Sequence, residues 1–172
     1  MHMLLRFLLI FLQKNFLPKA ALREVTKVQM RVFPIDLDFL MHVNNGMYFS
    51  FMDFGRIDMI FRNGTFDVCQ KNGWYGVVAG EMIKFRRSLK LWDKFTIETR
   101  VRGYDEKYFF IEQRFILKGE LMSTGMVKIR FLKKKGGSVH PTEITSLLKD
   151  LPANEIDKLG DEWFAFEKKY LG

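Results

Sequence analysis

The sequence predicts an α+β fold in which one long, buried helix is wrapped by a curved antiparallel sheet. Residues 47–61 form a segment of helical length with apolar side chains on nearly all sides, which is typical of a helix enclosed by a core. After residue 73 several segments alternate apolar and polar residues, as half-buried strands do. Only short joints separate these segments, and short joints favour antiparallel hairpins.

The first half of the chain predicts a strand, a loop and the long helix in that order. The strand is expected at 25–33 and the loop at 36–44. Asn44 or Asn45 is a suitable N-cap, since a side-chain oxygen there can accept a hydrogen bond from a free N–H of the first turn. The helix is expected to end near Asn63, where a glycine follows.

The second half predicts four more strands and a helical end. The strands are expected at 76–87, 94–104, 107–117 and 120–131, and one or two helices within 141–171. A chain of 172 residues favours a single domain. A single sheet of this size leaves an edge strand open, and pairing of two edges across a two-fold axis would cover it. We therefore expect a homodimer or a dimer of dimers.

The chain divides into an apolar N-terminal helix (1–23), a main domain (24–140) and a C-terminal helical extension (141–172). The apolar part of the first segment is shorter than the roughly 20 residues that a spanning helix needs. It also lacks a small-residue cleavage site for a signal peptidase. Arg6 and Gln13 share one helical face and leave a broad apolar face opposite.

Such a helix is expected to lie on an anionic membrane surface. A helix docked on the protein's own surface or on a partner subunit is the alternative, and an anchor or uncleaved signal is a third. We expect a cytoplasmic protein that is peripheral at the inner membrane face through residues 1–20.

The net charge of +8 is compatible with anionic lipid, nucleic acid or a phosphorylated ligand. No known nucleic-acid motif accompanies the basic residues, so nucleic acid is not an expected partner. The single cysteine, Cys69, excludes an intrachain disulfide and argues against a cysteine-based metal site. We expect no metal, because the sequence contains no evident ligand cluster.

The stretch from Asp36 to Tyr48 holds the polar residues that favour chemistry. Two carboxylates, Asp36 and Asp38, and the residues His42, Asn44, Asn45 and Gly46 lead directly into the apolar helix. A carboxylate beside a helix start can place a base next to a site for a negatively charged oxygen, since the first N–H groups of a helix favour anions.

These residues resemble the hotdog-fold thioesterases of the 4-hydroxybenzoyl-CoA thioesterase-like type. The resemblance runs from about Val28 to Phe131 and is carried by Asp36-x-Asp38, His42-Val43-Asn44-Asn45-x-x-Tyr48 and Asp53-x-x-Arg56. Two sequence segments, 36–45 and Arg86 to Leu91, are most similar to those of the branch called thioesterase superfamily member six. Members of that branch also begin with an apolar segment. Many relatives carry glycine just before the histidine, where this chain has Met41.

The resemblance implies a hotdog fold and an acyl-CoA thioesterase. Asp38 is expected to act as general base for water or to attack the thioester carbonyl directly. The thioester oxygen is expected to accept a hydrogen bond from the backbone N–H of Asn45, with Gly46 beside it. Asp53 is a rival acid, because some relatives place the catalytic carboxylate on the helix. Its spacing to Arg56 favours a structural ion pair instead.

Each of these residues also has a structural interpretation. Asp36 is expected to hold the loop through backbone hydrogen bonds, and Asp38 could cap the same loop. His42 either orients substrate, relays a proton or packs in the loop. Asn44 either positions water or caps the helix. Tyr48 either contacts substrate or lies in the core.

The apolar interior, rich in Phe and Met, favours a fatty acyl chain, and an aryl group is also compatible. The phosphates of coenzyme A would suit Arg86, Arg87 and Lys90, and we expect no cofactor beyond the coenzyme A of the substrate. We expect the implied activity to belong to lipid metabolism. The alternative function is a non-catalytic hotdog protein that binds acyl chains or acts as a scaffold at a membrane surface. A hotdog hydratase or dehydratase is a third alternative, but the sequence motif that is usual in hydratases is absent.

Overall fold

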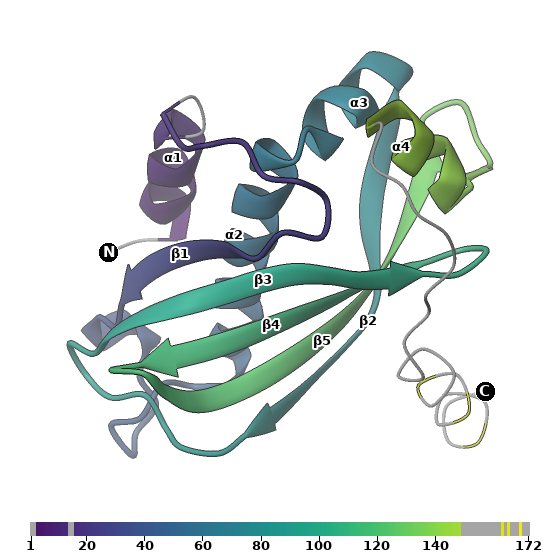
Figure 1. Ribbon diagram of the computed structural model, residues 1–172. Coiled ribbons are helices and arrows are strands. Elements are labelled where there is room, and N and C mark those ends of the chain that lie inside the picture. The colour runs from purple at the N-terminus through teal and green to yellow at the C-terminus, as the bar shows by residue number, and fades with distance from the viewer. Residues whose placement is uncertain (1–2, 14–15, 149–162, 164, 166–168, 170–172) are drawn as a thin grey trace.

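The computed structural model describes residues 3–13, 16–148, 163, 165 and 169. Its main body is a curved antiparallel sheet with one long helix packed against one face (Figure 1). The strand order is β1-β3-β4-β5-β2, and a short strand, β6, pairs with β5. The predicted α+β architecture is confirmed.

The described segments comprise four helices of at least two turns, one short 3-10 turn and six strands. The helical segments are α1 (Met3–Gln13), η1 (Pro34–Asp36), α2 (Asn45–Arg62), α3 (Thr65–Asn72) and α4 (Pro141–Leu148). The strands are β1 (Thr26–Arg31), β2 (Trp74–Phe85), β3 (Lys94–Tyr104), β4 (Phe109–Leu117), β5 (Glu120–Lys133) and β6 (Ser138–Val139). The long helix and the five main strands lie where the sequence predicts them, whereas α3 and β6 were not predicted. The predicted terminal helix begins as α4, and most of the chain beyond it lies outside the described residues.

Helix α2 is buried on most sides, as its composition predicts. It packs against β1 and β3, and Phe51 and Met52 have no exposed surface. The ring of Phe51 lies 5.2 Å from that of Phe95 on β3. The ring of Phe95 is stacked on that of Phe115 on β4 at 5.9 Å. These aromatic contacts fill the space between the helix and the sheet.

A polar network fixes the middle of α2 to the sheet. The fully buried Gln113 donates hydrogen bonds from Nε2 to the Met52 carbonyl (2.8 Å) and to Thr99 Oγ1 (3.1 Å). Its Oε1 accepts a hydrogen bond from Arg56 Nη1 at 3.0 Å. The helix can approach these groups because the residue facing them is Gly55, where a Cβ would lie 2.6 Å from both Gln113 Nε2 and Thr99 Oγ1.

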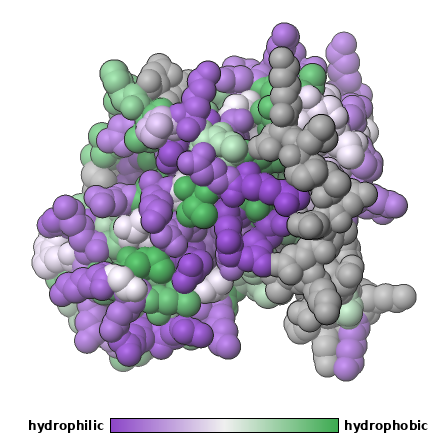
Figure 2. All heavy atoms as spheres, in the orientation of Figure 1, coloured by the Kyte–Doolittle hydropathy of each residue, from purple (hydrophilic) through white to green (hydrophobic). Residues whose placement is uncertain are grey.

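The opposite face of the sheet is largely hydrophilic (Figure 2). Ion pairs cross neighbouring strands there: Lys27 with Glu98 at 2.9 Å, Arg100 with Glu112 at 2.6 Å and Arg114 with Glu98 at 3.7 Å. Cross-strand pairs of opposite charge stabilise a sheet and mark a face that water reaches. The face of the sheet that carries α2 is therefore the one that encloses the core.

Helix α1 packs against α2, with Arg6 of its polar face turned inward and Gln13 exposed. Arg6 is 3% exposed and Ile10 is also buried. The outer face exposes the apolar side chains of Leu5, Phe7, Leu8, Leu9, Phe11 and Leu12. This contact matches the alternative in which the helix docks on the protein's own surface, whereas contact of the outer face with a membrane stays a prediction. No helix in the described part of the chain is long and apolar enough to cross a membrane.

Candidate active site

The loop before α2 is a short, closed turn. Leu37 and Val43 form an isolated antiparallel bridge, and the N–H of Asp38 donates to the carbonyl of His42 at 2.8 Å. A second bridge joins His42 to Lys90. The loop is therefore tied both to itself and to the segment between β2 and β3.

Asp38 lies half-buried in this turn, with its carboxylate oriented by the backbone. Its Oδ1 accepts hydrogen bonds from the N–H groups of Leu40 (2.9 Å) and His42 (3.2 Å). Its Oδ2 accepts no hydrogen bond from any residue that the structure describes. The loop-capping interpretation thus accounts for one carboxylate oxygen and leaves the other available for a substrate or a water molecule.

The start of α2 presents one backbone donor. Asn44 is the N-cap: its Oδ1 accepts from the Gly46 N–H at 2.9 Å, and its carbonyl accepts from Met47 N–H at 2.9 Å. The Gly46 N–H is therefore occupied by the cap. Asn45 is exposed and is the first residue of the helix, so its N–H has no acceptor within the helix. This N–H, at the positive end of α2, can bind an anionic oxygen.

Of the two interpretations of Tyr48, the structure shows the position in the core. Its side chain is 1% exposed, and its ring contacts Phe85 and Phe115 at 4.9 and 5.2 Å between centroids. Its Oη accepts a hydrogen bond from the Leu89 N–H at 3.1 Å. Burial raises the pKa of its phenol. The tyrosine supports the site by tying α2 to the segment that follows β2.

A basic cavity of about 670 Å³ brings three of the predicted site residues together. Its lining is formed by His42, Arg87, Ser88, Lys90, Asp93, Leu117, Lys118, Glu120 and Met122. Arg87 forms an ion pair with Glu120 at the exposed rim. Arg86 does not line this cavity, and its N–H donates to the Met122 carbonyl at 2.9 Å. Lys118, at the turn between β4 and β5, was not predicted as a site residue.

The chemistry of this lining suits anions. Arginine and lysine side chains bind phosphate oxygens, arginine through two parallel hydrogen bonds and lysine as a point charge. Arg87, Lys90 and Lys118 supply the positive charge of this lining, which also contains the carboxylates of Asp93 and Glu120. Within the described part of the chain, no group of three or more His, Cys, Asp or Glu side chains is arranged to bind a metal ion.

Asp53 lies away from the basic cavity. It is exposed on α2 and forms an ion pair with Arg56, as its spacing predicts. Arg56 also contacts Glu81 on β2 at 2.7 Å. Burial raises the pKa of Glu81, and the guanidinium of Arg56 opposes that shift. Asp53 instead lines a separate apolar cavity of about 420 Å³ between α2, α3 and β2.

One ion pair beside the site was not predicted. Asp36 has no exposed surface, and its Oδ2 accepts from the Phe33 N–H at 2.8 Å, as expected for a residue that holds the loop. Both carboxylate oxygens also accept hydrogen bonds from Arg6 of α1, at 3.0 and 2.6 Å. A lone arginine in an apolar helix was the available signal, since a buried charge needs a partner of opposite charge.

A model of the thioesterase-like superfamily matches residues 32–157. The chain belongs to this superfamily. The matched region contains the loop, α2 and the strands from β2 to β6. The candidate site of this thioesterase-like protein therefore lies inside the region that characterises the superfamily.

The chain is similar to curated proteins named protein THEM6, among them those of Xenopus laevis and Danio rerio. The protein from Xenopus laevis is 45% identical over 93 residues, which are 54% of this chain and 45% of the relative. The protein from Danio rerio is 36% identical over 105 residues, which are 59% of this chain and 52% of the relative. The chain thus spans about half the length of these relatives.

Solved structures of thioesterases and related proteins share the fold of this superfamily member. The probable thioesterase YbaW from Escherichia coli has a TM-score of 0.67 and 23% identity, and the alignment covers 72% of this chain and 96% of that chain. The protein SAV2348 from Staphylococcus aureus, solved in complex with CoA, has a TM-score of 0.66 and 16% identity, with 83% and 96% covered. The hotdog fold that the sequence resemblance implies is confirmed.

Proposed function

We propose that this member of the thioesterase-like superfamily is an acyl-CoA thioesterase that hydrolyses the thioester of a fatty or aryl acyl-CoA. The observation that carries the proposal is that one tight loop holds Asp38 and leads directly into the start of α2. An oriented carboxylate with one available oxygen precedes a helix whose first N–H, that of Asn45, has no helical acceptor. Thioester hydrolysis requires these two elements, a base or nucleophile and a donor for the developing oxyanion. Membership of the superfamily and the likeness to YbaW support it.

In the proposed reaction, Asp38 removes a proton from water while the water oxygen attacks the thioester carbonyl carbon. In the alternative route, Asp38 attacks directly and forms an anhydride that water then hydrolyses. The carbonyl oxygen becomes negative and accepts a hydrogen bond from the Asn45 N–H. The carbon–sulfur bond then breaks, and the thiolate of coenzyme A leaves without a strong general acid. Asn44, whose Oδ1 caps α2, positions the water through its side-chain NH2, and His42 orients the substrate from the wall of the basic cavity.

The basic cavity is the proposed site for the phosphates of coenzyme A. Its volume of about 670 Å³ lies in the range of roughly 300–1,000 Å³ that is common for small-molecule sites. Arg87, Lys90 and the additional Lys118 supply positive charge. Arg86 is exposed on the same segment and remains a candidate for phosphates outside the cavity. The CoA complex of SAV2348 supports the substrate class. We propose no other cofactor and no metal.

We further propose that the enzyme is a homodimer formed through β2. This strand ends the sheet, so its outer backbone groups are not paired with another strand of the sheet. It also exposes four large apolar side chains: Tyr75, Val78, Met82 and Phe85. Antiparallel pairing with β2 of a second copy would cover both features.

The exposed apolar face of α1 supports peripheral attachment to an anionic membrane surface. Replacing Leu5, Leu8 and Leu12 together by aspartate is expected to release the protein from liposomes that contain anionic lipid. Leu147→Asp, at an exposed leucine on α4, is the matched control and is expected to stay bound. Equal sedimentation of both variants with the liposomes would contradict attachment through α1.

The test of the proposed function is release of free thiol from a panel of acyl-CoAs, from C2 to C18 and including aryl-CoAs. Asp38→Asn is expected to lower the rate by about 100-fold or more, as loss of a positioned acid–base group does. Asp53→Asn is the matched control, because it removes the rival carboxylate and is expected to keep most of the activity.

Two results would contradict the proposed mechanism. If Asp53→Asn abolished hydrolysis while Asp38→Asn did not, the catalytic carboxylate would be the one on α2. If the folded wild-type protein released no thiol from any acyl-CoA, the non-catalytic acyl-binding function would take its place. Acyl binding should then tolerate Asp38→Asn.

A further inference from the structure

We propose that Arg6 of α1 is a positioning residue for the candidate active site. In this inference Arg6 neutralises the buried carboxylate of Asp36 and thereby fixes the loop that holds Asp38 and the start of α2. The proposal rests on the proposed function in one respect, namely that this loop is where hydrolysis takes place. The coupling between α1 and the loop can be measured without any activity.

The contact between Arg6 and Asp36 is bidentate and closed to solvent. Arg6 Nη1 donates to Asp36 Oδ1 at 3.0 Å, and Nη2 donates to Oδ2 at 2.6 Å. The two side chains are 2% and 1% exposed. Paired hydrogen bonds between a guanidinium and a carboxylate fix both distance and orientation, which a lysine in the same place could not do.

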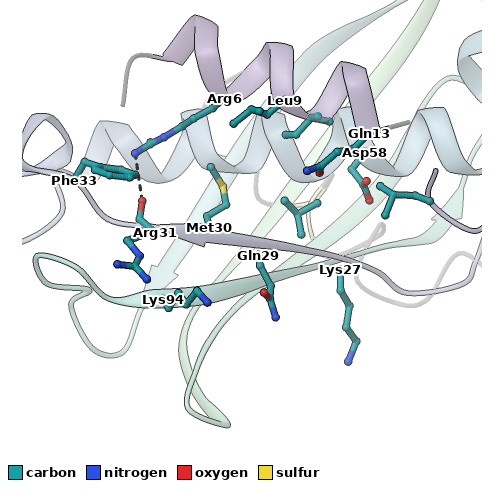
Figure 3. A pocket seen from close by; sticks show the side chains of 13 residues that line it. Arg6, Leu9, Gln13, Lys27, Gln29, Met30, Arg31, Phe33, Asp58 and Lys94 are labelled. Carbon is teal, nitrogen blue, oxygen red and sulfur yellow. Dashed lines mark hydrogen bonds between the residues drawn. The ribbon is translucent and has the colours of Figure 1, made fainter. Parts of the chain in front are cut away.

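The surroundings of Arg6 hold its side chain in one place. Figure 3 shows Arg6 reaching from α1 toward Phe33 and the backbone of β1. Its Nη2 also donates to the Arg31 carbonyl at 3.3 Å. Its Cζ lies 5.3 Å from the ring centroid of Phe33 and 5.2 Å from that of Phe51 on α2. Cation–π contacts of this kind are strongest where water is excluded. Arg6 thus joins α1, β1 and α2 at one point.

Asp36 transmits this contact to the site through its backbone. Its carbonyl accepts a hydrogen bond from the N–H of Asn44 at 2.9 Å, and Asn44 is the N-cap of α2. The donor proposed for the oxyanion, Asn45, is the next residue. Asp36 also lies two residues before Asp38, the proposed base, in the same tight loop. A shift of Asp36 would therefore move both the proposed base and the proposed oxyanion donor.

Loss of Arg6 would leave a buried carboxylate without a counter-charge, which is strongly unfavourable. The loop would respond by opening Asp36 to water. Opening breaks the Asn44 hydrogen bond and lets the start of α2 move. The effect is expected mainly on kcat, because the geometry of the reacting groups changes while the basic cavity for coenzyme A does not include Arg6.

The experiment compares the wild-type protein with Arg6→Met, Asp36→Asn, the double variant and Arg6→Lys. Two quantities are measured for each: amide hydrogen exchange at His42 and Asn44, and kcat and KM for the best acyl-CoA. Ile10→Ala is the matched control. Ile10 is also buried on α1, so its loss weakens the packing of the helix and leaves the ion pair in place.

Arg6→Met is expected to speed exchange at Asn44 and to lower kcat, each by about tenfold or more, with KM changed by less than about threefold. The double variant carries no buried unpaired charge and is expected to return both quantities to within about threefold of wild type. Arg6→Lys keeps the charge and loses the paired geometry, so it is expected to lie between these two. Ile10→Ala is expected to leave kcat within about twofold.

Three results would overturn the proposal. In the first, Arg6→Met has the same amide hydrogen exchange and the same kcat as the wild-type protein, while Asp38→Asn is inactive. The thioesterase assignment would then stand without a role for Arg6. The second is an equal loss in Ile10→Ala, which would make α1 a packing element only. The third is a double variant no better than Arg6→Met alone, which would exclude charge compensation.

If the wild-type protein hydrolyses no thioester, the proposed function fails, and the exchange rates alone decide whether Arg6 orders the loop. If Arg6→Met does not fold, Arg6→Lys and the double variant decide the same question.

Discussion

Met41 adopts a left-handed backbone conformation, with φ of 60°. For a residue with a side chain this conformation costs roughly 1–2 kcal/mol, whereas glycine adopts it freely. The side chain is 59% exposed, so it fills no space in the core that would offset the strain. The glycine that many relatives carry before the histidine thus has a physical reason in the geometry of this turn. Its replacement by methionine affects the backbone more than the interior.

Met41→Gly is expected to keep or raise the free energy of unfolding by up to about 1 kcal/mol, because it removes the strain at the cost of a more flexible unfolded chain. Leu40→Gly is the matched control. Leu40 is an exposed neighbour without a positive φ, and its change is expected to lower the free energy of unfolding by about 0.5–1 kcal/mol. Urea denaturation of both variants measures the difference. Equal destabilisation would show that the turn at Met41 is not strained.

At the scale of single elements, α2 offers a test of the backbone donor. Asn45→Ala is expected to keep activity within about threefold, because the proposed donor is the N–H and not the side chain. Asn45→Pro removes that N–H and is expected to lower kcat by about 100-fold or more. Proline is well suited to the first position of a helix. The preceding Asn44 has φ of −56° and ψ of 136°, a conformation that proline permits in its neighbour.

Circular dichroism and urea denaturation should show that Asn45→Pro is as stable as Asn45→Ala. If Asn45→Pro folded normally and hydrolysed acyl-CoA at the rate of Asn45→Ala, the oxyanion donor would have to be a different group.

The elements that the sequence predicts best are those with a long, regular pattern. Helix α2 is apolar on nearly all sides and has a cap at Asn44, so both its existence and its start follow from local physics. Helix α3 has eight residues and β6 has two, and patterns this short do not stand out from loops. Their formation depends on contacts with other elements: β6 pairs with the end of β5, and α3 packs on α2, α4 and β2.

The same distinction applies to the site residues. The loop-capping contacts of Asp38 and the place of Asn45 at the helix start follow from the sequence, because their neighbours in space are also neighbours in the chain. The sequence left the place of Tyr48 open, because its hydroxyl is bonded to the N–H of Leu89, which is 41 residues away. Arg6 was missed for a similar reason, since its partner Asp36 is 30 residues away. A single sequence can signal that a buried charge needs a partner, but it does not show which distant residue that partner is.

At the scale of the whole molecule, the open edge at β2 makes a prediction about assembly. The wild-type protein is expected to sediment with the mass of two chains. Val78→Lys places a charge at the centre of the exposed apolar edge and is expected to give a single chain, because lysine on an edge strand opposes pairing. Leu147→Lys, at a similarly exposed leucine on α4, is the control and should remain a dimer. A wild-type protein of single-chain mass at the same concentration would contradict the dimer.

The close approach at Gly55 limits how proteins descended from this one can diverge. The separation between helix and sheet is set there by the amide of Gln113 and the hydroxyl of Thr99, whose hydrogen-bond lengths vary little. On either side the separation depends on apolar side chains, whose volumes can change by one methylene at a time. New substrate preferences can therefore evolve by enlarging or reducing the interior at either end of α2. At the crossing point, Gly55 cannot be replaced by a larger residue, and the distance between helix and sheet cannot change in small steps.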